Sequence, residues 1–209
     1  MHGVIKGSQP EDIHPIIPYE VLKQAKPGRY TPETRARTLE YIAHPEDIYL
    51  LMLDRDDNVA DPTKVTTADE LLALLEPLLP GIGTAGRVVT RSTSSAIYAK
   101  QTNEVLTPPY GFHTYLLVRG NLDRFREILT ARMWNAGYGY CVLASPNKRT
   151  GVASVLERAV LDTTVFSPER LDYVANARIA KNAPFYQDRG APDLVPGCVL
   201  DLALQRHFI

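Results

Sequence analysis

Asp54 and Asp56 follow an apolar run, residues 48–53, and their spacing of two would place both carboxylates on one face of a continuing strand. Two adjacent carboxylates repel each other unless a divalent cation bridges them. Oxygen ligands of this kind suit Mg²⁺ or Mn²⁺. A third acid, Asp162, lies in another apolar, β-branched stretch, "RAVLDTTVF". Three strand-borne aspartates predict a site for two metal ions that catalyses phosphoryl or nucleotidyl transfer.

The acidic cluster "DRDDN" also allows a simpler interpretation as a solvated turn, which is the commoner structure for an isolated group of acids. Asp162, inside a stretch of its own where a loop aspartate is not expected, favours the metal site. Asp57 and Asp61 are more typical of turn residues. We therefore leave these two outside the predicted site.

His113 begins an apolar stretch after "PPYG". It is either a hydrogen-bonded structural residue or a donor to a phosphate, since Gly111 permits close approach of the backbone. Arg91 leads a hydroxyl-rich segment, "RSTSS", that contains Ser94 and Ser95. This segment is either an ordinary loop or a cradle of amides and hydroxyls for a triphosphate.

Four further residues are weaker candidates for contacts with nucleic acid. Arg158 and Arg170 are candidates for contacts with phosphate, although a surface salt bridge is the commoner role for a single arginine of this kind. Trp134 and Tyr138 could stack on bases, or could serve as core or subunit-contact residues at the end of an amphipathic helix.

The composition places these residues in one compact α/β body of 209 residues. Lys and Arg number 23 against 24 for Asp and Glu, so any site for a polyanion must be local. Cys141 and Cys198 stand far apart and are predicted to be buried, reduced thiols. The sequence shows no signal peptide and no apolar stretch long enough to span a bilayer, which predicts a cytoplasmic protein without a membrane partner.

Periodicity predicts the elements that position the candidate residues. Helices are expected over residues 19–26, 31–43, 67–79, 121–136 and 167–173. Strands are expected over residues 48–53, covered on both faces, and over 88–90, 114–118, 138–143 and 159–166. The "GIGTAG" segment follows a helix and precedes a strand, so it predicts a turn rather than a dinucleotide-binding motif.

Four ordered segments give the chain a resemblance to a known family: "IYLLMLDRD", "TRSTSSAIY", "GFHTYLLVRG" and "RAVLDTTVFSPERLDY". Their order resembles that of the archaeo-eukaryotic primase (AEP) superfamily, and more closely that of phage and plasmid primase-polymerases. In that family a strand ends in Asp-x-Asp, matched by Asp54 and Asp56; a histidine leads a second strand, matched by His113; and an apolar strand carries one aspartate, matched by Asp162. Gly111 stands where the family often has serine.

The resemblance implies a fold: an α/β (α+β) AEP-type catalytic core with an RRM-like palm sheet flanked by helices, plus an N-terminal α/β unit. We expect a single domain over residues 1–209, with a proline-rich arm (1–32), a motif-bearing core (48–173) and an irregular C-terminal segment (182–209).

The implied activity is that of a DNA primase and DNA polymerase, a nucleotidyltransferase. Asp54, Asp56 and Asp162 would hold two Mg²⁺ or Mn²⁺ ions. The residues expected to hold the nucleoside triphosphate are His113, Ser94, Ser95, Arg91 and Gly111, with Ser94, Ser95 or the Gly111 amide replacing the family's serine hydroxyl.

The resemblance further implies a single-stranded DNA template, a replicative helicase or helicase domain as partner, and a phage- or plasmid-encoded protein of the bacterial cytoplasm. Two alternatives remain open: a repair or gap-filling polymerase, and a catalytically inactive nucleic-acid-binding module of replication initiation.

Overall fold

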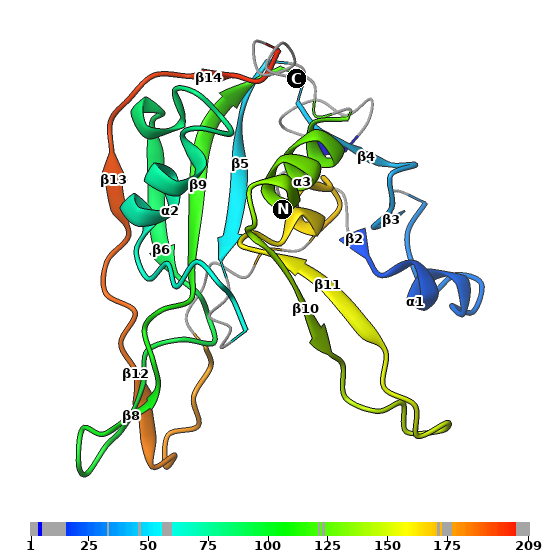
Figure 1. The fold of residues 1–209 in the computed structure, drawn as a ribbon. Coiled ribbons are helices and arrows are strands. Elements are labelled where there is room, and N and C mark those ends of the chain that lie inside the picture. The colour runs from blue at the N-terminus through cyan, green and yellow to red at the C-terminus, as the bar shows by residue number, and fades with distance from the viewer. Residues whose placement is uncertain are drawn as a thin grey trace.

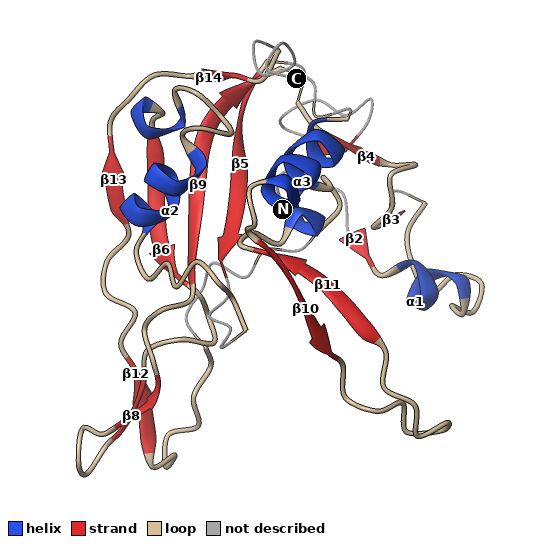
Figure 2. Cartoon of the chain, in the orientation of Figure 1, coloured by secondary structure: helices blue, strands red, loops and turns tan. Residues whose placement is uncertain are grey.

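The computed structural model describes residues 4–5, 16–32, 34–45, 47–55, 60–120, 122, 124–170, 172 and 177–203. Within these residues the chain is a mixed α and β protein in which short and long strands outnumber the helices (Figures 1 and 2). The predicted α/β (α+β) class is confirmed at this level. None of the helices among the described residues is long and apolar enough to cross a bilayer.

A five-stranded sheet forms the centre of the molecule (Figure 1). Its longest strands, β5 (Ile48–Arg55) and β9 (Phe112–Arg119), pair antiparallel along their full lengths. The other edge of β9 pairs antiparallel with β6 (Arg87–Arg91) and parallel with β14 (Leu200–Asp201). β13 (Asp193–Val195) completes the sheet beside β6.

Two helices, α2 (Ala68–Leu75) and α3 (Phe125–Asn135), cover one face of this sheet. On β5, Tyr49, Leu51 and Leu53 belong to the buried core that these helices complete. Ile48 and Leu50 point to the opposite face and are 44% and 45% exposed. The prediction that this strand is covered on both faces is therefore wrong at its N-terminal half, because side chains alternate and helices cover only one side.

The start of α2 forms a capping box. Thr67 Oγ1 accepts a hydrogen bond from Glu70 N at 3.2 Å, and Glu70 Oε2 accepts one from Thr67 N at 3.2 Å. Hydrogen bonds from Thr66 and Thr67 lower the pKa of Glu70. After α2, Gly81 adopts φ 87° and leads into a short 3₁₀ helix, η1 (Ile82–Thr84), so the prediction of a turn is confirmed.

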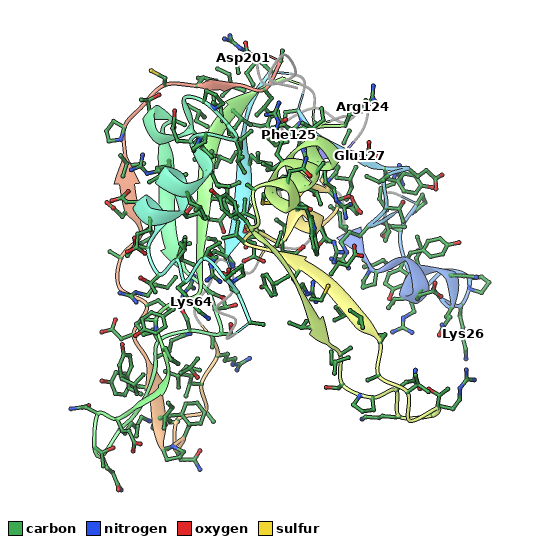
Figure 3. All side chains as sticks on the ribbon, in the orientation of Figure 1. Lys26, Lys64, Arg124, Phe125, Glu127 and Asp201 are labelled. Atoms are coloured by element: carbon green, nitrogen blue, oxygen red, sulfur yellow. The ribbon has the colours of Figure 1, made fainter. Side chains whose placement is uncertain are left out.

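The start of α3 fixes the helix against the core. Figure 3 labels Phe125, whose ring stacks on Phe166 with centroids 5.9 Å apart. Its labelled neighbours Arg124 and Glu127 are exposed. Arg132 Nη1 donates to Leu78 O at 2.7 Å, which ties α3 to the segment that follows α2.

Two β arms extend away from the central sheet (Figure 1). One is a hairpin of β10 (Gly139–Leu143) and β11 (Val155–Ala159). The other is a three-stranded sheet of β7 (Ile97–Ala99), β8 (Val105–Thr107) and β12 (Phe185–Gln187). Since β12, β13 and β14 all fall after residue 181, the expectation of an irregular C-terminal segment is wrong for residues 185–201: backbone pairing with β7, β6 and β9 orders them.

The N-terminal part contains the predicted short helix, α1 (Tyr19–Lys23), and four two-residue strands. β1 (Val4–Ile5) pairs with β4 (Ile42–Ala43), and β2 (Ile16–Ile17) pairs with β3 (Arg35–Ala36). The helix predicted over residues 31–43 is therefore wrong. Strand pairing of residues 35–36 and 42–43 with distant residues overrides the local helix propensity.

Two further expectations fail between residues 159 and 173. β11 ends at Ala159, and residues 160–166 form a turn followed by a 3₁₀ helix, η2 (Thr163–Phe166), in place of the predicted strand. Asp162 caps η2, because its Oδ1 accepts a hydrogen bond from Thr164 N at 2.8 Å. Residues 167–170 and 172 contain turns and no helix.

Cys141 and Cys198 are free thiols, but both are exposed. The prediction of buried thiols is wrong because Cys141 lies on an arm, away from the core, and Cys198 lies in the connection between β13 and β14.

Candidate active site

Asp54 and His113 face each other across two neighbouring strands. The β5–β9 register pairs them directly, and on the other side of β9 the register pairs His113 with Thr90 of β6. Asp54 Oδ1 lies 3.3 Å from His113 Nε2, and the two side chains are 16% and 10% exposed. The Asp54 carboxylate is thus held near the end of the strand and does not point into bulk water.

A second carboxylate contacts the other nitrogen of the same ring. Asp172 Oδ1 lies 3.4 Å from His113 Nδ1, and the Asp172 side chain is only 3% exposed. The hydroxyl of Tyr115 donates a short hydrogen bond to Asp172 Oδ2. Burial, reinforced by Asp172, raises the pKa of Tyr115 above its usual value, so the phenol keeps the proton that it donates.

Asp162 reaches the same region from a segment far along the chain. Its backbone N–H donates to Asp54 O at 3.1 Å, so the segments that carry the first and third predicted aspartates lie side by side. Asp162 comes from the turn before η2 and not from a strand, which corrects the expectation of three strand-borne aspartates. Asp56 lies outside the described residues.

A cavity of about 610 Å³ opens beside Asp162. It lies between the root of the β7–β8 arm and the root of the β10–β11 hairpin, with α3 as a third wall. Its size is within the range of small-molecule sites. The polar, charged and aromatic residues that line it include Ser94, Ser95, Arg126, Trp134, Tyr140, Glu157, Arg158 and Asp162.

The hydroxyl-rich segment forms a tight turn at one wall of this cavity. Ser95 is buried, and its hydroxyl donates to Ser92 O at 2.8 Å, while Ser94 is exposed. Gln187 Nε2 fixes the turn by donating to Thr93 O and Ser95 O at 2.7 and 2.9 Å. Of the two predicted hydroxyls, Ser94 is thus the one open to a ligand.

Gly111 also lines the cavity and packs against this turn. Ser92 N donates to Gly111 O at 2.9 Å, and a Cβ at position 111 would lie 3.3 Å from the Ser92 Cβ. A serine side chain here would crowd the turn, which gives a physical reason for the glycine.

Arg91 does not join the predicted nucleotide site. Its Nη1 donates to Pro109 O at 2.9 Å, and its side chain lines a separate cavity of about 260 Å³ with Phe112 and Asp193. Alternation along β6 explains this, because Thr90, and not Arg91, shares a face with His113.

The remaining candidates divide between the cavity and the rest of the surface. Arg158 and Trp134 line the cavity. Trp134 packs so closely over Gly139 that a Cβ there would lie 2.3 Å from the ring. Tyr138 packs against the core instead, and Arg170 is exposed outside the cavity.

Some residues close to His113 and Thr90 were not predicted from the sequence. Tyr115 could have been found, since it lies two residues after His113 and therefore on the same face of a strand. Asp172 lies in the last quoted segment, but no sequence spacing relates it to His113, because only tertiary folding brings the two residues together. Arg189 is similar: it is 6% exposed and donates to Arg91 O at 2.7 Å and to Thr90 Oγ1 at 3.2 Å.

The donor chemistry fits a hard divalent cation. Asp54 and Asp162 carry carboxylates on segments whose backbones adjoin, and carboxylate oxygens are ligands that suit Mg²⁺ or Mn²⁺. Within the described ranges, which omit Asp56, no three His, Cys, Asp or Glu side chains are grouped so as to hold one metal ion.

Comparison of the chain with protein-family models, with curated proteins and with solved structures finds no match. The fold and the site define a mixed α and β protein with a carboxylate–histidine cluster beside a polar cavity.

Proposed function

We propose that the protein is a primase-polymerase that transfers nucleotides from nucleoside triphosphates to a primer on a single-stranded DNA template. The observation that carries the proposal is the hydrogen bond of 3.1 Å between Asp162 N and Asp54 O, with His113 paired to Asp54 on the next strand. Residues of three separated motifs thus adjoin at one place. The helices on one face of the central sheet agree with the RRM-like palm that the resemblance implies.

In this proposal Asp54, Asp56 and Asp162 would hold two Mg²⁺ or Mn²⁺ ions. When bound, such ions activate the 3′-hydroxyl and stabilise the charge of the α-phosphate and pyrophosphate. The chain's own residues bind and orient the nucleotide. His113 and the exposed hydroxyl of Ser94 are donors for the triphosphate, and Arg126 and Arg158 of the cavity wall neutralise phosphate charge.

The aromatic residues of the cavity supply the contact with bases. Trp134 and Tyr140 both line it, and stacking on an aromatic ring tolerates every base, as template-directed synthesis requires. The expected partners are the template, nucleoside triphosphates and a replicative helicase or helicase domain, in the setting of phage- or plasmid-type replication.

The test is incorporation of labelled nucleotides on primed and unprimed single-stranded templates with Mg²⁺ or Mn²⁺. Asp54→Asn should lower incorporation by at least about 100-fold, since a metal-binding carboxylate is lost. Asp193→Asn, an exposed aspartate of β13 on the same sheet, is the matched control and should retain activity.

The outcomes separate the alternatives. Incorporation that survives Asp54→Asn contradicts the proposed site. Extension of primers without synthesis on unprimed templates favours the repair or gap-filling polymerase. Binding of single-stranded DNA without incorporation by the wild-type protein favours the inactive replication-initiation module.

A further inference from the structure

Asp172 is a buried carboxylate that lies in the last of the four quoted segments but has no role assigned by the sequence. Its side chain is 3% exposed, and a buried charge is stable only beside a compensating partner. The two oxygens have separate partners: Oδ1 faces His113 Nδ1 at 3.4 Å, and Oδ2 accepts the Tyr115 hydroxyl. Both partners belong to β9 and are two residues apart, so the carboxylate is held against one face of that strand.

His113 is held at both ends of its ring. Nε2 lies 3.3 Å from Asp54 Oδ1 and Nδ1 lies 3.4 Å from Asp172 Oδ1. The Tyr115 ring meets the imidazole edge to face, with an interplanar angle of 76° and centroids 6.3 Å apart. These contacts fix the rotation of the imidazole about its χ2 angle.

From this geometry we infer that Asp172, supported by Tyr115, is a positioning residue that orients His113 so that Nε2 faces the Asp54 side of the site. The inference rests on the proposed function, in which His113 contacts the triphosphate of the incoming nucleotide. A carboxylate behind a histidine sets which nitrogen is presented to the ligand, and its loss changes function without removing any group that touches the substrate.

Tyr115 acts on Asp172 and on His113, whose Nδ1 lies 3.4 Å from the Tyr115 hydroxyl, and not on the ligand. Its raised pKa keeps the phenol protonated, so it remains a donor that fixes the carboxylate. Its ring is 7% exposed, which leaves little surface for a substrate. Tyr115→Phe should therefore reproduce part of the effect of Asp172→Asn.

Kinetics test the inference through coupling between residues. Asp172→Asn should raise the KM for nucleoside triphosphate by about tenfold with a smaller change in kcat, and Tyr115→Phe by a smaller factor. In a His113→Ala background, Asp172→Asn should change KM by less than about twofold, because a residue that acts through His113 has nothing left to position. If Asp172→Asn raises KM by the same factor in the His113→Ala background as in the wild type, the two residues act independently and the inference is wrong.

A spectroscopic measurement separates this inference from the proposed function. The ¹⁵N resonances of the His113 ring, assigned by their loss in His113→Gln, should shift in Asp172→Asn and return toward the wild-type values in Asp172→Glu, which restores the charge. Asp193→Asn should leave them unchanged. This readout needs no polymerase activity, so absence of incorporation refutes the proposed function alone, whereas unshifted His113 resonances in both Asp172→Asn and Tyr115→Phe refute the positioning role.

Discussion

At the scale of single residues, the end of β5 separates two kinds of charge on its two faces. Asp54 points to the face opposite the two helices and meets His113 there. The next residue, Arg55, points to the covered face, where its Nη2 lies 2.7 Å from Asp61 Oδ2 and 3.0 Å from Val65 O. The side chains of Arg55 and Asp61 are 2% and 0% exposed. A buried ion pair therefore joins the end of β5, one residue after Asp54, to Asp61.

Asp61 should matter for stability and not for catalysis. Its Oδ1 accepts hydrogen bonds from Thr63 N and Oγ1 at 2.8 Å, so it is the turn residue that the sequence predicts, and its other oxygen compensates Arg55. Asp61→Asn leaves the Arg55 charge buried without its carboxylate and should lower the free energy of unfolding by about 3 kcal/mol.

Urea denaturation of Asp61→Asn measures this loss. Asp69→Asn is the control: Asp69 pairs with Arg87 at 3.0 Å, but its side chain is 85% exposed, and loss of such a pair costs at most about 1 kcal/mol. Equal effects of the two substitutions would contradict the argument from burial.

Tyr49 gives the fold a dependence on alkaline pH. Burial raises its pKa from 10.0 to about 12, and its hydroxyl donates to Gly120 O at 2.7 Å. A folded pKa above the unfolded one adds stability that is fully present below about pH 10 and is lost as pH rises through about 12. A difference of two pKa values corresponds to stabilisation on the order of 2 to 3 kcal/mol.

Comparison of Tyr49→Phe with the wild type isolates this contribution. The difference in unfolding free energy between the two proteins should shrink by that amount between about pH 9 and pH 12. Tyr115, whose pKa is raised in the same direction, contributes to both proteins and cancels. A difference that stays constant over this range would show that Tyr49 titrates alike in the folded and unfolded chains.

At the scale of elements, α2 depends on its cap. Thr67→Ala removes the acceptor for Glu70 N and should lower stability by about 1 kcal/mol, measured by thermal or urea unfolding. Thr102→Ala is a suitable control, since the Thr102 hydroxyl also accepts a backbone N–H, from Glu104 at 3.3 Å, but caps no helix. A loss for Thr102→Ala as large as that for Thr67→Ala would show that the cap has no special role.

The elements that sequence patterns predicted correctly are those whose stabilising contacts show in the local sequence. β5 and β9 are long, mainly apolar runs, and α2 and α3 bury apolar side chains three to four residues apart, so their positions follow from the sequence. β2, β3 and β12 are two or three residues long and are stabilised by backbone pairing with distant strands. Such pairing produces no recognisable pattern in the local sequence. The helix predicted over residues 31–43 failed for the same reason.

The residues of the candidate site also differ in how well the sequence predicts them. Asp54 and His113 lie on long strands, and the structure pairs them directly. Asp162 was predicted as a site residue but was assigned to a strand. It lies instead at the start of η2, where its side chain caps that helix. Asp172 and Arg189 enter the region from loops that only the completed fold brings close, and no spacing in the sequence reports such an approach.

At the scale of the whole molecule, the two β arms diverge from the end of the central sheet that carries the candidate site (Figure 1). The cavity lies where their roots meet, lined by Thr107 and Pro108 on one side and by Tyr140 and Arg158 on the other. Asp162 also lines this cavity, which therefore lies next to the strand end that carries Asp54.

The chain has one tryptophan, Trp134, and it lines this cavity with 37% of its surface exposed. Its fluorescence therefore reports occupancy of the cavity without any label. Single-stranded DNA or a nucleoside triphosphate with Mg²⁺ should quench the emission in a saturable way, because a base that stacks on the indole changes its surroundings.

Arg158→Gln should weaken the binding measured by this quenching, since a cation of the same cavity is lost. Raised salt should weaken binding to the wild type, because phosphate contacts are screened. Arg170→Gln, an exposed arginine outside the cavity, should leave the titration unchanged. Emission that stays constant at saturating DNA and nucleotide would place any bound nucleic acid elsewhere on the protein.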